Sequence, residues 1–146
     1  MRIQLLVCAA ALAGCGRGAP APVEPVSSSE AAVRGFMKAA ADSNLTRMGE
    51  LWGTARGPGR RSVSEADYGK LLVVMQAYLR GDSIRVVSDQ AAAGRDDQRN
   101  VVIQLYRGTC VKQIPMLTVR TAKGAWLVQE ADLNAAGNPA RPCDRG

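Results

Sequence analysis

Apolar residues in the middle of the chain recur at the spacing of amphipathic helices. The pattern runs from about residue 28 to residue 80 and predicts three helices, with a loop over residues 53–62 where Gly, Pro and Arg gather. Ser27 with Glu30, and Ser62 with Glu65, have the spacing of capping boxes before the first and third helices. The predicted buried faces are Val33, Phe36, Met37 and Ala40, then Leu45, Met48, Leu51 and Trp52, and finally Tyr68, Leu71, Leu72, Met75 and Leu79.

After residue 82 the period changes to two, which is typical of half-buried strands. Gly124 lies in a short connection that predicts a hairpin, residues 93–100 predict another turn, and Pro115 predicts a bulge or sheet edge. Three helices followed by about four antiparallel strands indicate an α+β domain. The alternating apolar positions are Ile84 and Val86, then Val101, Ile103 and Leu105, then Leu117 and Val119, and finally Trp126 and Val128.

The chain begins with a short apolar run, from Ile3 to Leu12, that follows a single arginine. Ten helical residues cover about 15 Å, whereas a bilayer core is about 30 Å thick, so the run predicts an export signal rather than a membrane span. The run ends in "LAGC", residues 12–15, which resembles the lipobox of bacterial lipoproteins. The resemblance implies that residues 1–14 are removed and that Cys15 carries acyl chains. The alternative is an ordinary secretory signal with a chance cysteine.

Residues 15–27 contain Pro20, Pro22 and Pro25 among small residues, so they predict an extended tether. At about 3.1 Å per residue the tether reaches about 40 Å. The predicted organisation is therefore a signal over residues 1–14, a tether over 15–27, an α+β domain over 28–134 and a tail over 135–146.

Composition limits the chemistry that the chain offers. Apolar residues make up 47% and charged residues 22%, which is typical of a globular domain. The net charge is +6, but the 15 arginines and 4 lysines are scattered, which predicts a basic soluble surface and no nucleic-acid partner. The absence of histidine removes the usual general base and the commonest zinc ligand. Glu130 and Asp132 are interpreted as a solvated strand end, and we identify no catalytic residue, metal site or cofactor.

Two cysteines remain once Cys8 leaves with the signal and Cys15 carries lipid. Cys110 and Cys143 form an even pair in an exported chain, which predicts a disulfide that pins the tail to the sheet. Two free thiols, or a redox-active pair, are the alternatives, although the sequence has no C-x-x-C motif.

The segments 31–52, 68–79 and 114–133, with "KGAW" in the last of them, resemble small bacterial lipoproteins whose exported domain has the fold of nuclear transport factor 2 and ketosteroid isomerase. The resemblance implies a curved antiparallel sheet wrapped around helices, often with a pocket; the cystatin-like fold shares this plan. The aromatic residues that are expected either in the core or in a pocket are Trp52, Tyr68, Tyr78, Tyr106 and Trp126. The candidate residues for contact with an anion are Arg56, Arg60 and Arg61.

We therefore expect a lipoprotein of the bacterial envelope, on either membrane or at the cell surface, that acts as a non-catalytic binding or assembly module. Its expected partners are the bilayer, through the acyl chains on Cys15, and an envelope protein or small ligand. One alternative is a ketosteroid isomerase-like enzyme or a carrier of a small apolar ligand, with a pocket between sheet and helices. Another is an anion- or peptidoglycan-associated protein that uses the arginine loop.

Overall fold

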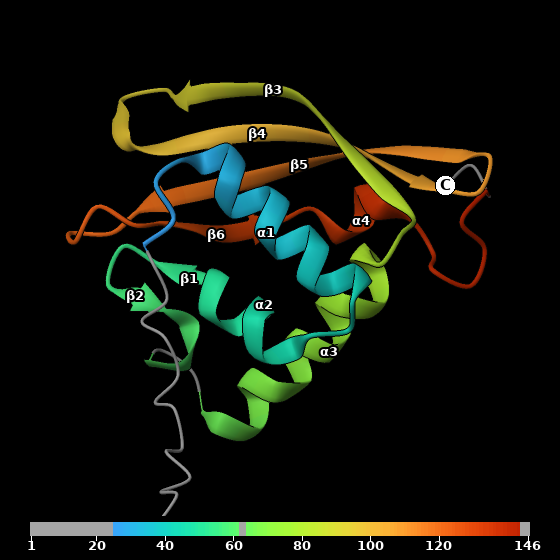
Figure 1. Ribbon diagram of the computed structural model, residues 1–146, viewed down its shortest axis with the longest axis horizontal. Helices are drawn as coiled ribbons and strands as arrows, with labels where there is room; N and C mark the ends of the chain where they lie inside the picture. The colour runs from blue at the N-terminus through green and yellow to red at the C-terminus, as the bar shows by residue number, and fades with distance from the viewer. Residues whose placement is uncertain (1–24, 62–63, 144–146) are drawn as a thin grey trace, which may run out of the picture.

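The computed structural model describes residues 25–61 and 64–143, with the side chain of Arg61 excepted (Figure 1). The fold is α+β with a four-stranded antiparallel sheet, as predicted from the two hydrophobic periods. The elements are α1 (Ser29–Ala41), α2 (Leu45–Leu51), β1 (Gly53–Thr54), β2 (Gly57–Pro58), the 3-10 turn η1 (Gly59–Arg61), α3 (Glu65–Leu79), β3 (Ser83–Ala92), β4 (Arg95–Arg107), β5 (Cys110–Arg120), β6 (Trp126–Ala131) and α4 (Leu133–Ala136).

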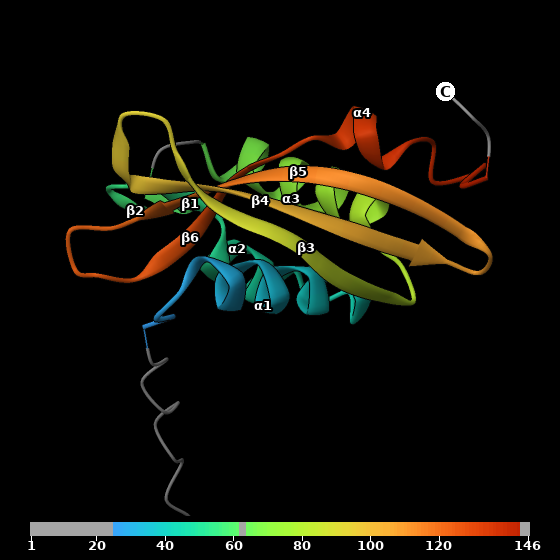
Figure 2. The same cartoon turned by 90° about the horizontal axis from the view of Figure 1, so that it is seen from above.

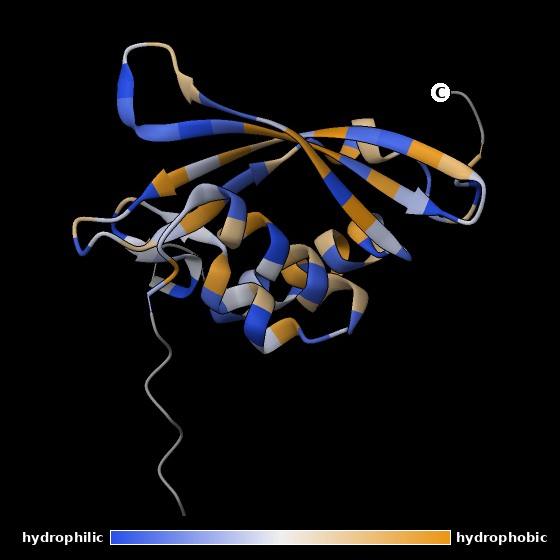
Figure 3. Ribbon diagram, turned by 45° about the horizontal axis from the view of Figure 1, so that its top comes forward, coloured by the Kyte–Doolittle hydropathy of each residue, from blue (hydrophilic) through white to orange (hydrophobic). Residues whose placement is uncertain are grey.

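The large sheet is a curved meander in the order β3-β4-β5-β6, so each strand pairs with its neighbour in the chain. Seen from above, the strands twist past one another while α1 and α4 lie on different sides of the bundle (Figure 2). Apolar and polar residues alternate along the strands, as the hydropathy colouring shows (Figure 3). One face of the sheet is therefore available for packing against helices.

The core lies between α1, α3 and the apolar face of β4 and β5. Helix α1 contacts all four strands of the sheet. Register places Ile103 opposite Ile114 and Val101 opposite Met116, and these four side chains are at most 2% exposed. Val33 and Phe36, at 0% exposure, confirm the buried face predicted for the first helix.

The helix caps lie close to the predicted positions but not on them. Ser28, rather than Ser27, caps α1 by accepting a hydrogen bond from the backbone N–H of Ala31 at 3.1 Å. Asn44 caps α2 by accepting a hydrogen bond from the backbone N–H of Arg47 at 2.9 Å. Ser64 caps α3, whereas the predicted cap Ser62 lies outside the described residues. More than one serine precedes both α1 and α3, so spacing alone does not select the capping residue.

The expected loop over residues 53–62 contains the small β1–β2 hairpin, and Trp52 lies beyond the end of α2. The turn expected over residues 93–100 is shorter, because β4 begins at Arg95. In β5 the unbroken pairing with β4 puts Ile114, Met116 and Thr118 on the core face. Thr118 is therefore buried and Leu117, predicted to face the core, is partly exposed, although Val119 is buried as well. Pro115 accepts a hydrogen bond from Asp132 just past the last β6 pair, so its missing N–H faces an edge, one of the two predicted alternatives.

A polar cluster holds the N-terminal end of α1 on the sheet. Asp89 of β3 accepts hydrogen bonds from the Ser29 hydroxyl and from Arg99 Nε, and Arg99 also donates to the Asp89 carbonyl at 2.9 Å. Ser29 is only 3% exposed. Asp89 is half-buried, and Ser29 and Arg99 satisfy both of its carboxylate oxygens.

Arg107 joins the C-terminal ends of two helices at the other end of the sheet. Its guanidinium donates to the carbonyls of Arg80 at 2.8 Å, of Ala136 at 2.9 Å, and of Tyr78. These carbonyls lie at or just after the last turns of α3 and α4, where helix carbonyls lack partners within the helix. Burial lowers the pKa of Arg107, which marks the desolvation that these hydrogen bonds offset.

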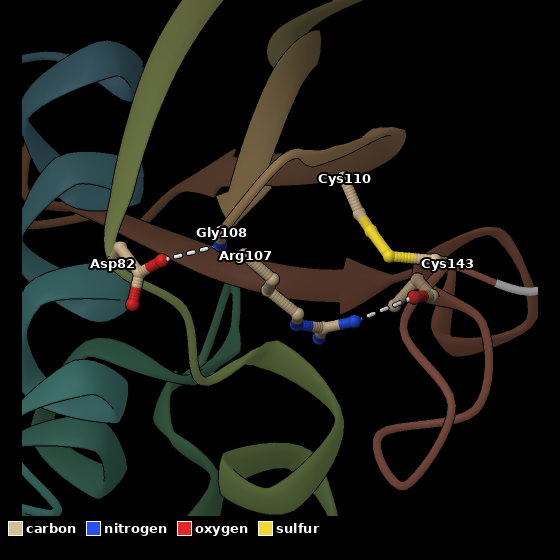
Figure 4. Close-up of a disulfide and its surroundings, with 6 residues drawn as sticks. Asp82, Arg107, Gly108, Cys110 and Cys143 are labelled. Carbon is tan, nitrogen blue, oxygen red and sulfur yellow. Dashed lines mark hydrogen bonds between the residues drawn. A yellow bond between two sulfur atoms is a disulfide. The ribbon is translucent and has the colours of Figure 1, made fainter.

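Cys110 and Cys143 form a disulfide beside this guanidinium (Figure 4). Their Cα atoms are 5.2 Å apart, and 33 residues separate them in the chain. In the turn between β4 and β5, which precedes Cys110, the Gly108 N–H donates a hydrogen bond to the Asp82 carboxylate at 2.6 Å. The disulfide therefore attaches the chain that follows α4 to the first residue of β5.

Replacing Arg107 by Met should lower the free energy of unfolding by about 2 kcal/mol, because a charge-assisted set of hydrogen bonds to helix carbonyls is lost. Urea denaturation followed by circular dichroism measures this. Arg85→Met, at an exposed position on β3, is the matched control and should change stability by less than about 0.5 kcal/mol. Equal effects of the two substitutions would contradict the assigned role of Arg107.

Removing the disulfide with the double substitution Cys110→Ser and Cys143→Ser should cost about 3–4 kcal/mol, because a closed loop of this length restricts the unfolded chain. Thermal denaturation of oxidised and reduced protein checks the prediction. A reductant should lower the Tm of the parent protein and leave that of the double variant unchanged. A parent protein insensitive to reductant would show that the bond does not contribute.

Candidate functional site

An apolar cavity of about 510 Å³ lies at the end of the domain where the described chain begins. The β5–β6 turn, the β1–β2 hairpin and the segment before α1 gather there (Figure 1). The cavity walls include Val26, Leu51, Ala55, Pro58, Trp126 and Leu127. Its volume lies in the range of small-molecule sites.

Long-range backbone contacts hold the walls of this cavity in place. The backbone N–H of Trp126 donates to the Val26 carbonyl at 2.9 Å, which joins the segment before α1 to β6. Trp52 forms a parallel bridge with Val128, and its indole N–H donates to the Gln129 carbonyl at 3.2 Å. These contacts link residues far apart in the sequence, so the cavity depends on the complete fold.

Gly59 allows the β1–β2 segment to fold back over Trp52. Its N–H donates to the Trp52 carbonyl at 2.8 Å. A Cβ at residue 59 would lie 2.5 Å from two atoms of the Trp52 ring, closer than any side chain tolerates. The glycine-rich composition of this loop therefore has a packing reason, and a phosphate-binding role is not needed to explain it.

Cationic groups surround the mouth of the cavity. Arg47 pairs with Glu50 at 2.8 Å, so its charge is balanced locally. Arg56, from the β1–β2 hairpin, and Lys123, from the β5–β6 turn, are exposed and also line the cavity. Within residues 25–61 and 64–143 neither side chain has an acidic partner. The mouth therefore carries positive charge that the described part of the chain does not neutralise.

The five predicted aromatic residues do not form one pocket. Trp52 and Tyr68 pack with ring centroids 5.7 Å apart, and the Tyr68 hydroxyl donates to the Gly49 carbonyl at 2.7 Å. Trp126 lines the cavity, with the Arg120 guanidinium 5.9 Å from its ring centroid.

Tyr78 and Tyr106 lie toward the opposite end of the sheet. Tyr106 pairs with Ser83 and Val111, and Tyr78 gives its carbonyl to Arg107. The expected aromatic set therefore divides into a packed pair, one cavity residue and two remote residues.

The three arginines of the predicted anion contact also separate. Arg56 lines the cavity, and Arg60 is an exposed residue of η1 whose charge acts on Tyr68. The Arg61 side chain lies outside what the structure describes. Sequence reasoning missed Lys123 and Val26; Val26 is one of two valines in the proline-rich segment, so its residue type gave no signal of a site.

The space expected for an isomerase-type pocket, between sheet and helices, is occupied by buried side chains such as Phe36, Met48 and Ile103. Over the described ranges, the buried polar residues are Ser29 and Thr118, so no Asp or Glu is buried there. Glu130 and Asp132 line an open groove of about 570 Å³, and Asp132 caps α4 by accepting from the Ala135 N–H at 2.9 Å. The described residues hold no cluster of three potential metal ligands.

Helix α3 departs from the one-sided pattern predicted for it. Tyr68, Leu72, Met75 and Leu79 are buried as expected, but Leu71 is 41% exposed. Val73 and Val74 are also exposed, so α3 is apolar on both its core side and part of its solvent side.

Comparison of the chain with known families, characterised proteins and solved structures found no match in any of the three. In the part of the chain that the structure describes, no helix is long and apolar enough to cross a membrane. The site is therefore interpreted from its own geometry.

Tyr68 should make stability depend on alkaline pH. Burial raises the pKa of Tyr68, with the nearby charge of Arg60 acting in the opposite sense. A pKa above its unfolded value of about 10 means that the stabilisation is complete below that pH and is lost as the pH rises further. Tyr68→Phe should lose about 1 kcal/mol near pH 7, from the hydrogen bond to Gly49.

Urea denaturation between pH 8 and pH 11 measures this, since the difference between parent and Tyr68→Phe should shrink above about pH 10. A difference that stays constant across this range would show that Tyr68 ionises as readily in the folded chain as in the unfolded one.

Proposed function

We propose that this chain is a lipid-anchored protein of the bacterial cell envelope, and that its domain is a non-catalytic binding module with the fold plan of nuclear transport factor 2. The "LAGC" sequence supports the anchor, although residues 1–24 lie outside the described part of the chain. The curved antiparallel sheet packed against helices supports the fold plan. The cavity at the tether end supports a binding role.

The observation that carries the proposal is the position of Pro25 and Val26 on the edge of the cavity. Pro25 lies ten positions after Cys15, and an extended chain of that length spans at most about 36 Å. If Cys15 carries acyl chains, the cavity end of the domain is the end nearest the bilayer. A cationic mouth suits that location, because anionic lipids attract basic groups near the surface.

The carrier of a small apolar ligand was expected to use a pocket between sheet and helices, a space that buried side chains fill. The cavity at the tether end supports a carrier role at a different place. The isomerase alternative requires a buried carboxylic acid, and the described residues supply none in the core. The peptidoglycan-associated alternative depends on three arginines acting together, of which the structure places Arg56 on the cavity. Binding therefore has more support than catalysis.

Replacing Cys15 by Ser should move the protein from the membrane fraction to the soluble fraction of a bacterial host, because the acyl chains can no longer be attached. Cys8→Ser is the matched control: it changes a thiol within the signal and should leave the protein in membranes. Mass spectrometry of the parent should find a chain that begins at an acylated Cys15. An unmodified start, or a Cys15→Ser protein retained in membranes, would refute the anchor.

A further inference from the structure

We propose that the 510 Å³ cavity binds an amphipathic anion, with the apolar body of the ligand against Val26, Trp126 and Leu127 and its anionic group at Arg56 and Lys123. This inference rests on the proposed binding role of the domain. It does not depend on the lipid anchor, because each residue that carries it belongs to the described domain.

The walls determine the apolar part of the ligand. Trp126 and Leu127 are at most 9% exposed, and with Val26 and Leu51 they present hydrocarbon surface to the cavity. Burial of such surface is favourable at about 25 cal/mol per Å² and sets no directional requirement. The cavity therefore suits a flexible chain or a compact ring system, and a sugar or nucleotide would leave many polar groups unpaired.

The mouth determines the charge of the ligand. Arg47 is already balanced by Glu50, which leaves Arg56 and Lys123 as the cavity cations without an acidic partner in the described part of the chain. They come from different hairpins, so a head group between the β1–β2 and β5–β6 connections would face both. The two cations favour an anion over a neutral apolar molecule of the same size. Because both are exposed, the head group remains in contact with water.

A ligand of this chemistry has two sources. One is a free amphipathic anion such as a fatty acid, and the other is an anionic lipid of the bilayer. Dodecanoate is a suitable probe for the shared chemistry, and dodecanol is its neutral counterpart of equal chain length. Vesicles of phosphatidylglycerol, compared with vesicles of phosphatidylcholine, test the bilayer as a source. The full chain with Cys15→Ser avoids detergent, which would itself compete for an apolar cavity.

Tryptophan fluorescence reports binding, because Trp126 lines the cavity and Trp52 is the second of two tryptophans in the chain. Dodecanoate should give a saturable change at concentrations below those at which it forms micelles. The double substitution Arg56→Gln and Lys123→Gln should weaken dodecanoate binding about three- to tenfold, since exposed ion pairs contribute little each. Lys70→Gln, at an exposed lysine of α3 remote from the cavity, should bind as the parent does.

A second variant tests the cavity itself. Ala55→Phe places a ring in the cavity from an exposed position, so it should abolish the dodecanoate response while circular dichroism stays unchanged. Dodecanoate displaced by phosphatidylglycerol vesicles, but not by phosphatidylcholine vesicles, would identify the bilayer as the source. Dodecanoate binding that neither vesicle affects would identify a free anion.

The proposal fails if dodecanoate gives no saturable change, if dodecanol binds as tightly as dodecanoate, or if Ala55→Phe binds as the parent does. A Cys15→Ser protein that stays in membranes would refute the anchor and leave this result unaffected, because both can be measured on the same chain. The failures of the two proposals are therefore distinguishable.

Discussion

The position of α1 across the curved sheet is the constraint on which the rest of the structure depends. This helix contacts all four strands, and its apolar face supplies Val33 and Phe36 to the core. Ser29 holds its N-terminal end on the sheet by donating to the Asp89 carboxylate, which also accepts a hydrogen bond from Arg99. Because Val26 precedes this fixed end by three residues, its carbonyl lies within hydrogen-bond distance of the Trp126 N–H. The cavity wall is thus a consequence of how α1 is held.

The two ends of the domain differ in structure: one carries the Arg107 cluster and the disulfide, and the other carries the cavity. At one end the Arg107 guanidinium satisfies carbonyls from α3 and α4, and the Cys110–Cys143 disulfide attaches the following chain beside it. A domain of little more than a hundred residues buries a limited core, so such additional links contribute a large share of its stability. At the other end the hairpins leave the space that we propose as the binding site.

Local patterns predicted the elements, and long-range pairing decided the site. The spacing of Val33 and Phe36, and the alternation of Val101 and Ile103, reflect the geometry of one helix and one strand, so the sequence carries them directly. The bridge between Trp52 and Val128 joins residues far apart in the sequence, and no hydrophobic periodicity predicts it. Thr118 was placed on the wrong face because the prediction followed Leu117 and Val119, whereas pairing with β4 puts Met116 and Thr118 on the core face.

The candidate site was harder to predict because its residues are ordinary in sequence. Val26 resembles a tether residue, and Lys123 resembles any turn lysine. What distinguishes them is that folding brings them to one cavity with Trp126. The aromatic prediction failed for the opposite reason. Tyr78 and Tyr106 have the residue type of pocket walls, but the end of α3 and the strand register of β4 place them toward the far end of the sheet. Residue type alone is therefore weak evidence of a site when the position of the residue in the fold is not known.

Under the proposed binding role, the exposed cations at the cavity mouth predict a modest affinity, because solvent screens each contact with an anionic group. A modest affinity is sufficient if the domain is held near its ligand. Under the proposed anchor, about ten residues separate the lipidated cysteine from the cavity edge, so a bilayer ligand is presented at the high effective concentration of a short linker, on the order of millimolar. Tether length and site strength are then matched: a short tether makes a weak, reversible site useful, and a tight site would hold its ligand too long to exchange it.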